Sequence, residues 1–376
     1  MITVLKGELL MSKVYFADIR ARSEGTSKIE KIKKLFDKAN FGDLIDEDDF
    51  TAVKIHFGEH GNDGYINPVF ARQVVDKIKE FKGKPFVADT NTLYSGMRHN
   101  SIDHNTVANL HGFNFSVLDA PVIIADGLRS QNFLEVEIGG KHFDKVKIAS
   151  DFVHADGMIV MSHFKGHEIA GFGGSIKNLA MGCAPAAGKK DQHSVEIQSD
   201  NNTCIACGTC AEVCPENAIV VEDFAVIDPK KCIGCGECIT ACPVDAIGMD
   251  WESEVAPFME RMTEYAYGAV KNKIDKVGYI NFLLNITPEC DCAPFSDAPL
   301  VRDIGILASK DPIALDKASY DLVNKQQGLK HSHLEKNYEP GEDKFKGSRD
   351  HTEGTIQLTY GEEIGLGKTE YELIEI

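Results

Sequence analysis

The spacing of hydrophobic and polar residues in the first half of the chain alternates between a helical period and the short apolar runs of buried strands. Ser27-x-x-Glu30 is a capping box that precedes apolar positions at helical spacing, and Asn67-Pro68 opens a second helix. Apolar runs over 52–57 and 85–89 flank that second helix and predict a βαβ unit. The pattern further predicts a helix over 101–110, a strand over 122–125, a hairpin over 133–148, a strand over 158–161 and a helix over 174–181.

The same alternation returns near the C-terminus. It predicts an amphipathic helix over 254–270, strands over 277–284 and 304–307, a helix from Asp311-Pro312 to about 328, a surface loop over 331–351, and strands over 355–360 and 370–376. This order predicts an α/β fold, with a mixed or mostly parallel sheet and helices on both faces. Because the pattern breaks at 199–250 and then resumes, we expect a discontinuous α/β domain over 12–198 and 251–376. A small α+β domain over 199–250 would be inserted in it, and three serial domains are the alternative.

The interrupting segment contains eight of the 11 cysteines, in two copies of one pattern. Each copy reads Cys-x-x-Cys-x-x-Cys-x-x-x-Cys-Pro, which is the iron–sulfur run of bacterial ferredoxins. In that run three closely spaced thiolates bind one cluster, and the fourth cysteine turns away to bind the other. The sequence therefore predicts a ferredoxin-like domain with two [4Fe–4S] clusters, one held by Cys204, Cys207, Cys210 and Cys242, the other by Cys232, Cys235, Cys238 and Cys214.

Zinc sites and disulfides are the other uses of clustered cysteines. Zinc sites usually pair Cys-x-x-Cys units without a third cysteine at the same step, and disulfide frameworks belong to short secreted chains. The two halves also repeat beyond the ligands, since Gly208 matches Gly236, and Ala218 matches Ala246. Small residues between the ligands let backbone N–H groups approach the cluster sulfurs. The repeat therefore favours two half-ferredoxins over either alternative.

The formal net charge of −18 argues against nucleic acid or an anionic membrane as a partner. No run of 18 apolar residues and no export signal are found, and Met11 is a second candidate start because SKVYFADIR resembles a first strand. Many free cysteines are typical of a reducing compartment. We therefore expect a cytoplasmic protein of a low-oxygen cell, whose partner is a soluble electron donor or acceptor protein.

Chemically capable side chains follow five of the apolar runs. Ligands of open α/β sheets bind beyond the carboxyl ends of strands, so we expect these side chains to line one pocket. The candidate catalytic residues are His56, His163, Lys165 and His167, as bases or proton donors. A glycine-rich turn that enters a helix can hold a phosphate or carboxylate. The candidate residues for a small anion are Gly171, Gly173, Gly174, Lys177, Asn178, Tyr94 and Arg98.

This glycine-rich string matches neither the Walker loop nor the dinucleotide fingerprint, so it indicates no nucleotide, and a purely structural turn is the alternative. Residues 184–193 predict a flexible loop that gates the site or is simply solvated. Three cysteines remain outside the ferredoxin pattern. Free cysteine is commonly buried and inert, but a Cys-x-Cys pair can bind a metal or reach a cluster edge. A candidate extra metal site is formed by Cys183, Cys290 and Cys292.

Several segments together resemble a known family over residues 12–376. HFGEHG, DTNTLYSGMR, HFKGHEIAGFGGSIKNLAMGCA, TPECDCAPFSD and DIGILASKDPIALDKAS are similar to the iron–sulfur-centre proteins of the domain of unknown function 362 family. That resemblance implies an uncharacterised α/β domain with an inserted ferredoxin, and no settled reaction. Over one short stretch, the His/Lys and glycine-rich block also resembles the nickel-pincer lactate racemase group.

The sequence supports three functional hypotheses. In the first, the chain is an oxidoreductase whose clusters relay electrons to a pocket in the α/β domain, where a small anionic substrate is reduced. In the second, it is a non-catalytic electron carrier or a module that binds a ligand or partner. In the third, the three remaining cysteines hold an additional metal. The substrate, the electron donor, the reduction potentials and the oligomeric state do not follow from the sequence.

Overall fold

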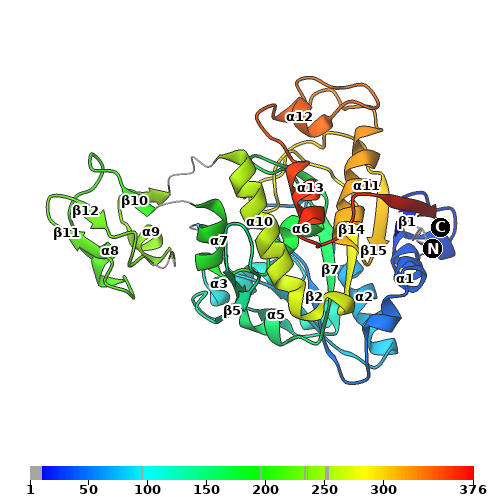
Figure 1. The fold of residues 1–376 in the computed structure, drawn as a ribbon, viewed down its shortest axis with the longest axis horizontal. Helices are drawn as coiled ribbons and strands as arrows, with labels where there is room; N and C mark the ends of the chain where they lie inside the picture. The colour runs from blue at the N-terminus through cyan, green and yellow to red at the C-terminus, as the bar shows by residue number, and fades with distance from the viewer. Residues whose placement is uncertain (1–10, 95, 195–196, 233, 235, 250–253) are drawn as a thin grey trace, which may run out of the picture.

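A computed structural model describes residues 11–94, 96–194, 197–232, 234, 236–249 and 254–376. Its centre is an eight-stranded sheet in the order β16-β1-β15-β14-β7-β2-β3-β4. Parallel pairing joins β14, β7, β2, β3 and β4, while β15 is antiparallel to both of its neighbours. The predicted fold class, a mixed and mostly parallel α/β sheet, is therefore confirmed (Figure 1).

The bounds of the sheet strands agree closely with the apolar runs of the sequence. They are β1 (Ser12–Asp18), β2 (Phe50–Lys54), β3 (Lys84–Asp89), β4 (Val122–Ile124), β7 (Gly157–His163), β14 (Val277–Leu283), β15 (Gly305–Ser309) and β16 (Tyr371–Glu375). The predicted hairpin over 133–148 is β5 (Phe133–Glu137) and β6 (Lys145–Ala149). Two short strands, β8 (Lys165–His167) and β9 (Gly171–Gly173), pair with each other beyond the end of β7.

Helices cover both faces of the sheet because successive side chains of a buried strand point to opposite sides. On β7, Met158 packs in one hydrophobic cluster and Ile159 in the other. The cluster around Met158 includes side chains of α6 (Ser175–Ala180), α10 (Val255–Val270) and α11 (Pro312–Asn324). The cluster around Ile159 includes side chains of α1 (Lys28–Lys38) and α2 (Pro68–Glu80).

The starts predicted from cap residues for α1 (Lys28–Lys38), α2 (Pro68–Glu80) and α11 (Pro312–Asn324) are confirmed by side-chain hydrogen bonds. The Ser27 side chain accepts a hydrogen bond from the backbone N–H of Glu30 at the start of α1. The caps of α2 and α11 are Asn67 and Asp311, each followed by a proline at the first helical position. The remaining helices of the α/β body are α3 (Ser101–Leu110), α4 (Phe115–Leu118), α5 (Ser150–His154), α7 (Ala186–His193), α12 (Lys344–Ser348) and α13 (Ile356–Glu363).

Residues 197–249, hereafter the cysteine lobe, lie to one side of this body (Figure 1). The lobe contains β10 (Ile197–Ser199), β11 (Ile219–Val221), β12 (Ala225–Ile227) and β13 (Ile247–Met249), with α8 (Thr209–Glu212) and α9 (Glu237–Ala241). Strand β10 pairs with β13, and β11 pairs with β12, both antiparallel. A separate small hydrophobic cluster joins these elements, with Ile197, Ile219 and Ile247 among its buried members.

Three predictions about local structure are wrong. Residues 355–360 are not a strand but the start of α13, which packs on α10, and the Tyr360 hydroxyl donates to the buried Glu264 at 2.7 Å. Residues 331–351 are not only a surface loop, because they contain α12, whose Phe345 is 3% exposed. Residues 184–193 are not a flexible loop, because most of them form α7. In each case tertiary packing overrides the local preference of the sequence. No helix of the described ranges is long and apolar enough to cross a membrane.

Candidate functional site

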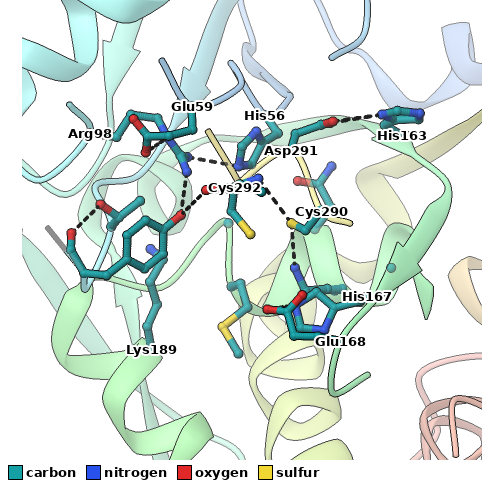
Figure 2. Close-up of a pocket in the computed structure, with 18 of the residues that line it drawn as sticks. His56, Glu59, Arg98, His163, His167, Glu168, Lys189, Cys290, Asp291 and Cys292 are labelled. Carbon is teal, nitrogen blue, oxygen red and sulfur yellow. Dashed lines mark hydrogen bonds and ion pairs between the residues drawn. The ribbon is translucent and has the colours of Figure 1, made fainter. Parts of the chain in front are cut away.

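The carboxyl ends of the parallel strands surround a cavity of about 850 Å³ (Figure 2). The segments that follow β2, β3, β7 and β14 all contribute side chains to its wall. Most of the residues singled out in the sequence are brought together there. They are His56, Tyr94, Arg98, His163, Lys165, His167, Gly173, Gly174, Lys177, Asn178, Cys290 and Cys292. The fifth strand end, after β4, places Asp126 behind this wall, where it accepts from the Asn91 backbone N–H at 3.0 Å.

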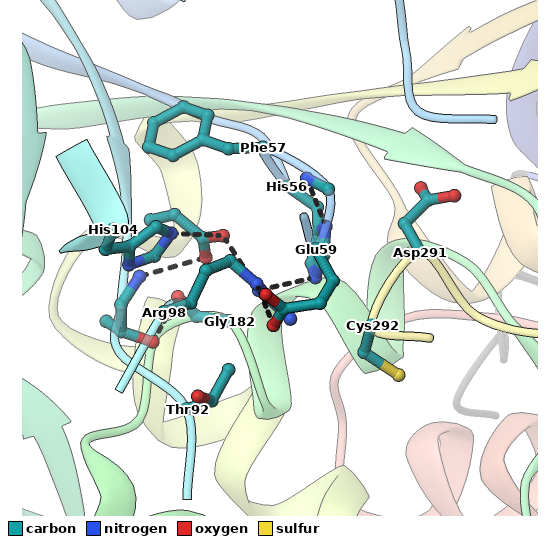
Figure 3. A network of polar contacts seen from close by, with 12 residues as sticks. His56, Phe57, Glu59, Thr92, Arg98, His104, Gly182, Asp291 and Cys292 are labelled. Carbon is teal, nitrogen blue, oxygen red and sulfur yellow. Dashed lines mark hydrogen bonds and ion pairs between the residues drawn. The ribbon is translucent and has the colours of Figure 1, made fainter. Parts of the chain in front are cut away.

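Arg98 is the centre of the polar network on one wall (Figure 3). Its guanidinium donates to Glu59 at 3.0 Å and to the Tyr94 hydroxyl at 2.7 Å, and it contacts the His56 ring at 2.9 Å. The side chain is 2% exposed, so Glu59 supplies the compensating charge that a buried cation requires. Burial, with the nearby Arg98 charge, lowers the pKa of His56 to about 3. His56 is therefore neutral at physiological pH and is not a ready proton donor.

A second ion pair lies beneath the cavity, between neighbouring strands β2 and β3. The Lys54 ammonium donates to Asp89 at 3.0 Å and to the Asn178 side-chain oxygen at 2.8 Å. The amide nitrogen of Asn178 donates in turn to Met161 and Ser162 on β7. Asn178 thus connects α6 to the strand ends, which gives it a positioning role in the wall.

His163, Lys165 and Asp291 form a third group. The His163 Nε2 atom contacts the Leu284 carbonyl oxygen at 2.7 Å, and its Nδ1 atom lies 3.1 Å from Asp291 and 2.8 Å from the Lys165 ammonium. Lys165 also forms an ion pair with Asp291. Burial raises the pKa of the Asp291 carboxyl, but the Lys165 and His163 charges outweigh it and hold that pKa well below its usual range. Both ring nitrogens of His163 are thus engaged by protein atoms.

Cys290 and Cys292 lie in the same wall, on the segment after β14 (Figure 2). The Lys177 ammonium donates to the Cys290 sulfur at 3.2 Å, and the Cys292 backbone N–H donates to the same sulfur at 3.4 Å. The hydrogen bond from the Cys292 side chain, with the Lys177 and Lys165 charges, holds the pKa of Cys290 well below its usual range. The same hydrogen bond and burial raise the pKa of Cys292. The surroundings therefore favour the thiolate form at Cys290 and disfavour it at Cys292.

The predicted anion site at the start of α6 is already occupied by a carboxylate of the protein. The Ser175 and Ile176 backbone N–H groups donate to Asp316 at 2.8 and 2.9 Å. A Cβ on Gly174 would lie 2.4 Å from an Asp316 oxygen, which explains the glycine there. Gly171 does not line the cavity, since it packs against Gly354. The glycine-rich turn therefore has a structural role, because an internal side chain takes the donors that an anion would need.

Two further cavity residues differ in how they are held. His167 is 5% exposed, and its Nδ1 atom accepts from the Ala170 backbone N–H at 3.0 Å, so a neutral ring has its proton on Nε2. Lys189 on α7 donates to Thr90, Asn91 and Ala184 oxygens at 2.6–2.7 Å. Burial lowers the pKa of Lys189 to about 8. Lys189 therefore titrates close to physiological pH, inside the cavity.

Cys183 does not join Cys290 and Cys292 in the cavity wall. Its backbone pairs with Leu179 and Ala149, its side chain is fully buried in the hydrophobic cluster, and it does not line the cavity. Burial raises the pKa of the Cys183 thiol to about 12, as expected for an inert core cysteine. Among the residues that the structure describes, no three His, Cys, Asp or Glu side chains are placed to hold one metal ion. The three-cysteine metal site is thus not assembled.

The lobe cysteines surround two separate hollows. One is lined by Cys204, Cys207, Cys210 and Cys242, and the other by Cys214, Cys232 and Cys238. Cys235 lies outside the described residues. The grouping is crosswise, because the last cysteine of each motif faces the hollow of the other. None of the ten described cysteines forms a disulfide. The two halves also repeat one contact, since the Ala218 and Ala246 backbone N–H groups donate to the Cys214 and Cys242 sulfurs at 3.2 and 3.1 Å.

The second half of the lobe contacts the α/β body beside the cavity. The Lys190 ammonium on α7 donates to the Cys232 carbonyl oxygen at 3.0 Å, and Arg129 forms an ion pair with Glu237 at 2.9 Å. Gly236 packs so closely on the body that a Cβ there would lie 2.7 Å from the Leu93 carbonyl oxygen. Leu93 and the adjacent Tyr94 both line the cavity, so one wall of the cavity is shared with the lobe contact.

The sequence predictions missed several residues that the geometry makes important. Asp291 stands between the two pocket cysteines, and Glu59 neutralises Arg98. Lys189 belongs to residues 184–193, which the sequence predicts as a loop that gates the site or is solvated. Glu59 and Asp291 follow strand ends, so the rule that found their neighbours also applies to them. Lys189 gives no such signal, because its place depends on α7 packing beside α10.

Comparisons with known proteins find a family model and several distantly similar solved structures, among them the two that follow. The lactate racemase apoprotein of Thermoanaerobacterium thermosaccharolyticum is similar with a TM-score of 0.37 and 12% identity, covering 67% of this chain and 49% of that one. A Thermotoga maritima protein is similar with a TM-score of 0.39 and 10% identity, covering 80% of this chain and 61% of that one. The chain thus spans less than two thirds of either protein's length. No curated protein matches.

One family model matches residues 51–321, which is more than half of the chain and extends on both sides of the cysteine lobe. On that match the chain belongs to the family described as Domain of unknown function (DUF362).

Proposed function

We propose that this protein is an iron–sulfur oxidoreductase, in which two [4Fe–4S] clusters in the cysteine lobe serve a substrate cavity in the α/β body. The observation that carries the proposal is the crosswise grouping of the lobe cysteines around two hollows. Crossed ligation is a property of the two-cluster ferredoxin run, and the third cysteine at the same step with a closing Cys-Pro in each half separates this run from zinc sites.

The residues present fit such clusters in two further ways. A [4Fe–4S] cubane takes one thiolate at each of four irons, so its ligands surround a hollow instead of meeting at one ion. Backbone N–H groups of Ala218 and Ala246 already donate to ligand sulfurs, the type of contact that stabilises a reduced cluster. We assign Cys204, Cys207, Cys210 and Cys242 to one centre. Cys214, Cys232, Cys235 and Cys238 are assigned to the other.

The chemistry that these clusters supply when bound is the transfer of single electrons at low potential. The contact between Gly236 and Leu93 gives the second-motif centre the short connection to the cavity, since Gly236 lies between Cys235 and Cys238 in the chain. In the first motif, a Cβ on Gly208, the counterpart of Gly236, would meet nothing within 4 Å, and Cys207 is exposed to solvent. We therefore place the second-motif centre next to the cavity and the first-motif centre toward an external redox protein.

The cavity supplies protons to a bound substrate through Lys189 and Lys165. Lys189 is the better matched acid near neutral pH, because burial brings its pKa to about 8. To receive its proton, the substrate must replace one of the three oxygens to which the ammonium donates. His56 is kept neutral beside Arg98, and His163 has both ring nitrogens bonded, so we assign them positioning roles. His167, with Nε2 as its donor atom, is a third candidate to contact substrate.

The charges in the cavity bear on the substrate. Arg98, Lys165 and Lys177 are paired with Glu59, Asp291 and Cys290, and the start of α6 is paired with Asp316. Lys189 is the remaining cation, and its ammonium donates to three neutral oxygens. At each of the other cationic groups, an anionic substrate would have to displace the partner that is already there. We therefore propose a small polar substrate without a required negative charge.

Metal analysis of protein purified without oxygen tests this proposal. We expect about eight iron and eight sulfide per chain. Cys207→Ser and Cys238→Ser should each reduce the content of one centre. Cys290→Ser is the matched control, because it removes a cavity thiol and should leave the iron content unchanged. Absence of sulfide in the unaltered protein would refute the clusters. If the protein contains both clusters but its cavity binds and reduces no substrate, the protein is a non-catalytic electron carrier.

A further inference from the structure

The segment with Cys290 and Cys292 is held rigidly from several sides. Arg349 donates to the Pro288 carbonyl oxygen at 2.9 Å and pairs with Glu289 at 2.8 Å. The Glu59 backbone N–H donates to the Asp291 carbonyl oxygen at 2.8 Å, and the Tyr94 hydroxyl donates to the Cys292 carbonyl oxygen at 3.2 Å. Contacts of this kind fix the relative position of the two thiols in the cavity wall.

The two sulfurs are chemically different, although they come from one short loop. Cys290 accepts hydrogen bonds from the Lys177 ammonium and from the Cys292 N–H, while Cys292 receives no bond from Lys177. An ammonium beside one sulfur favours its thiolate, which is the form that attacks a disulfide. The neighbouring thiol is then in place to resolve the product. One attacking and one resolving cysteine are the two parts that thiol–disulfide exchange needs.

We propose that Cys290 and Cys292 are a redox-active dithiol that reduces a small disulfide. The Cys290 thiolate attacks one sulfur of the substrate disulfide, forms a mixed disulfide and releases the first substrate thiolate. Cys292 loses its proton and attacks the Cys290 sulfur, which forms the Cys290–Cys292 disulfide and releases the second thiolate. Two electrons and one proton then restore the Cys290 thiolate and the Cys292 thiol. The net reaction adds two electrons to the substrate disulfide and yields two thiolates.

The electron supply rests on the proposed function, whereas the exchange steps do not. Two single-electron centres deliver the number of electrons that one disulfide takes up. Tyr94 links the two sites, because it follows Leu93 at the lobe contact and donates to the Cys292 carbonyl oxygen. The cavity of about 850 Å³ and the 8% exposure of Cys290 favour a small molecule over a disulfide on a protein surface.

Trapping the intermediates tests the proposal. Protein kept free of oxygen is treated with bis(2-hydroxyethyl) disulfide, and the reaction is quenched in acid. The protein is then alkylated and digested, and the mass of the peptide that contains both cysteines is measured by mass spectrometry. We expect an internal disulfide in the unaltered protein, a mixed disulfide on Cys290 in Cys292→Ser, and no adduct in Cys290→Ser. Cys183→Ser is the matched control and should behave as the unaltered protein. Reduced cysteines throughout, trapping on Cys292 instead, or a retained metal that blocks alkylation would overturn the proposal.

Lys177→Met tests the role of the ammonium. It should slow formation of the mixed disulfide on the order of tenfold at neutral pH, and the rate should recover as pH rises through the normal thiol range. An unchanged pH profile would contradict that role. Iron and sulfide are measured on the same samples, so the two proposals fail separately. Cluster-free protein that still cycles with dithiothreitol would refute only the electron supply, and cluster-containing protein with an inert cysteine pair would refute only the dithiol.

Discussion

Replacement of Gly236 by alanine tests whether the lobe contact carries electrons to the cavity. Gly236 precedes α9 with φ of +78°, and Gly208 occupies the equivalent position before α8 with φ of +83°. An alanine in this left-handed region costs about 1–2 kcal/mol at either position. The two substitutions therefore share one backbone penalty, and they differ in what the new methyl group meets.

The difference can be worked from the structure. A Cβ on Gly236 would lie 2.7 Å from the Leu93 carbonyl oxygen and 3.0 Å from a His99 ring carbon, whereas ordinary contacts begin near 3.4 Å. The lobe and the Leu93 backbone must separate by about 0.7 Å to relieve the closer contact. A Cβ on Gly208 meets nothing within 4 Å, so Gly208→Ala leaves the lobe contact unchanged and serves as the matched control.

The assay is the single-turnover reoxidation of dithionite-reduced protein by bis(2-hydroxyethyl) disulfide, followed by visible absorbance without oxygen. We expect Gly236→Ala to slow this reoxidation severalfold, because the rate of electron transfer falls exponentially with the distance between donor and acceptor. Gly208→Ala should lower stability by the shared backbone penalty of about 1–2 kcal/mol and leave the reoxidation rate unchanged. Equal rates in the two variants would refute the assignment of this contact as the electron route.

Other predictions concern the acid in the cavity, the buried carboxylate and the cluster ligands. In the unaltered protein, turnover should fall as pH rises through about 8, because Lys189 must be protonated to act as an acid, and Lys189→Met should remove that limb of the pH profile. Burial raises the pKa of Asp316 from 3.8 to about 6, so the native state holds this proton more tightly than the unfolded chain. The stabilising contribution of Asp316, about 3 kcal/mol, is fully present below pH 4 and is lost as pH rises through about 6. Asp316→Asn should remove this pH dependence from the free energy of unfolding measured in urea. Cys214→Ala should remove the paramagnetic signal of the second-motif centre and spare the first, and loss of the first-motif signal alone would contradict crossed ligation.

Local patterns were sufficient to predict the sheet and its major helices. Apolar runs such as that of β7 are buried on both faces in this sheet, and caps such as Ser27 and Asn67 act over only three residues, so neighbours in the sequence contain the information. The gathering of strand-end side chains in one cavity also followed, because parallel strands end at one edge.

The remaining features depend on contacts between distant segments. The start of α6 has the sequence of an anion site, but Asp316, 141 residues away from Ser175, fills it. Thr355–Tyr360 has strand-forming residues, yet packing against α10 makes it helical. The Cys290 sulfur accepts from Lys177, which is 113 residues away, and the lobe contact needs Leu93 opposite Gly236. None of these partners is visible in the neighbouring sequence.

The most direct test of the central claim is electron paramagnetic resonance of the anaerobically purified protein, reduced with dithionite at low temperature. The account predicts two spin-half [4Fe–4S] centres, each integrating to one spin per chain, with the broadening of magnetic coupling between neighbours in one lobe. A spectrum without iron–sulfur signals, or with a single uncoupled centre in protein whose cysteines are all intact, would contradict it.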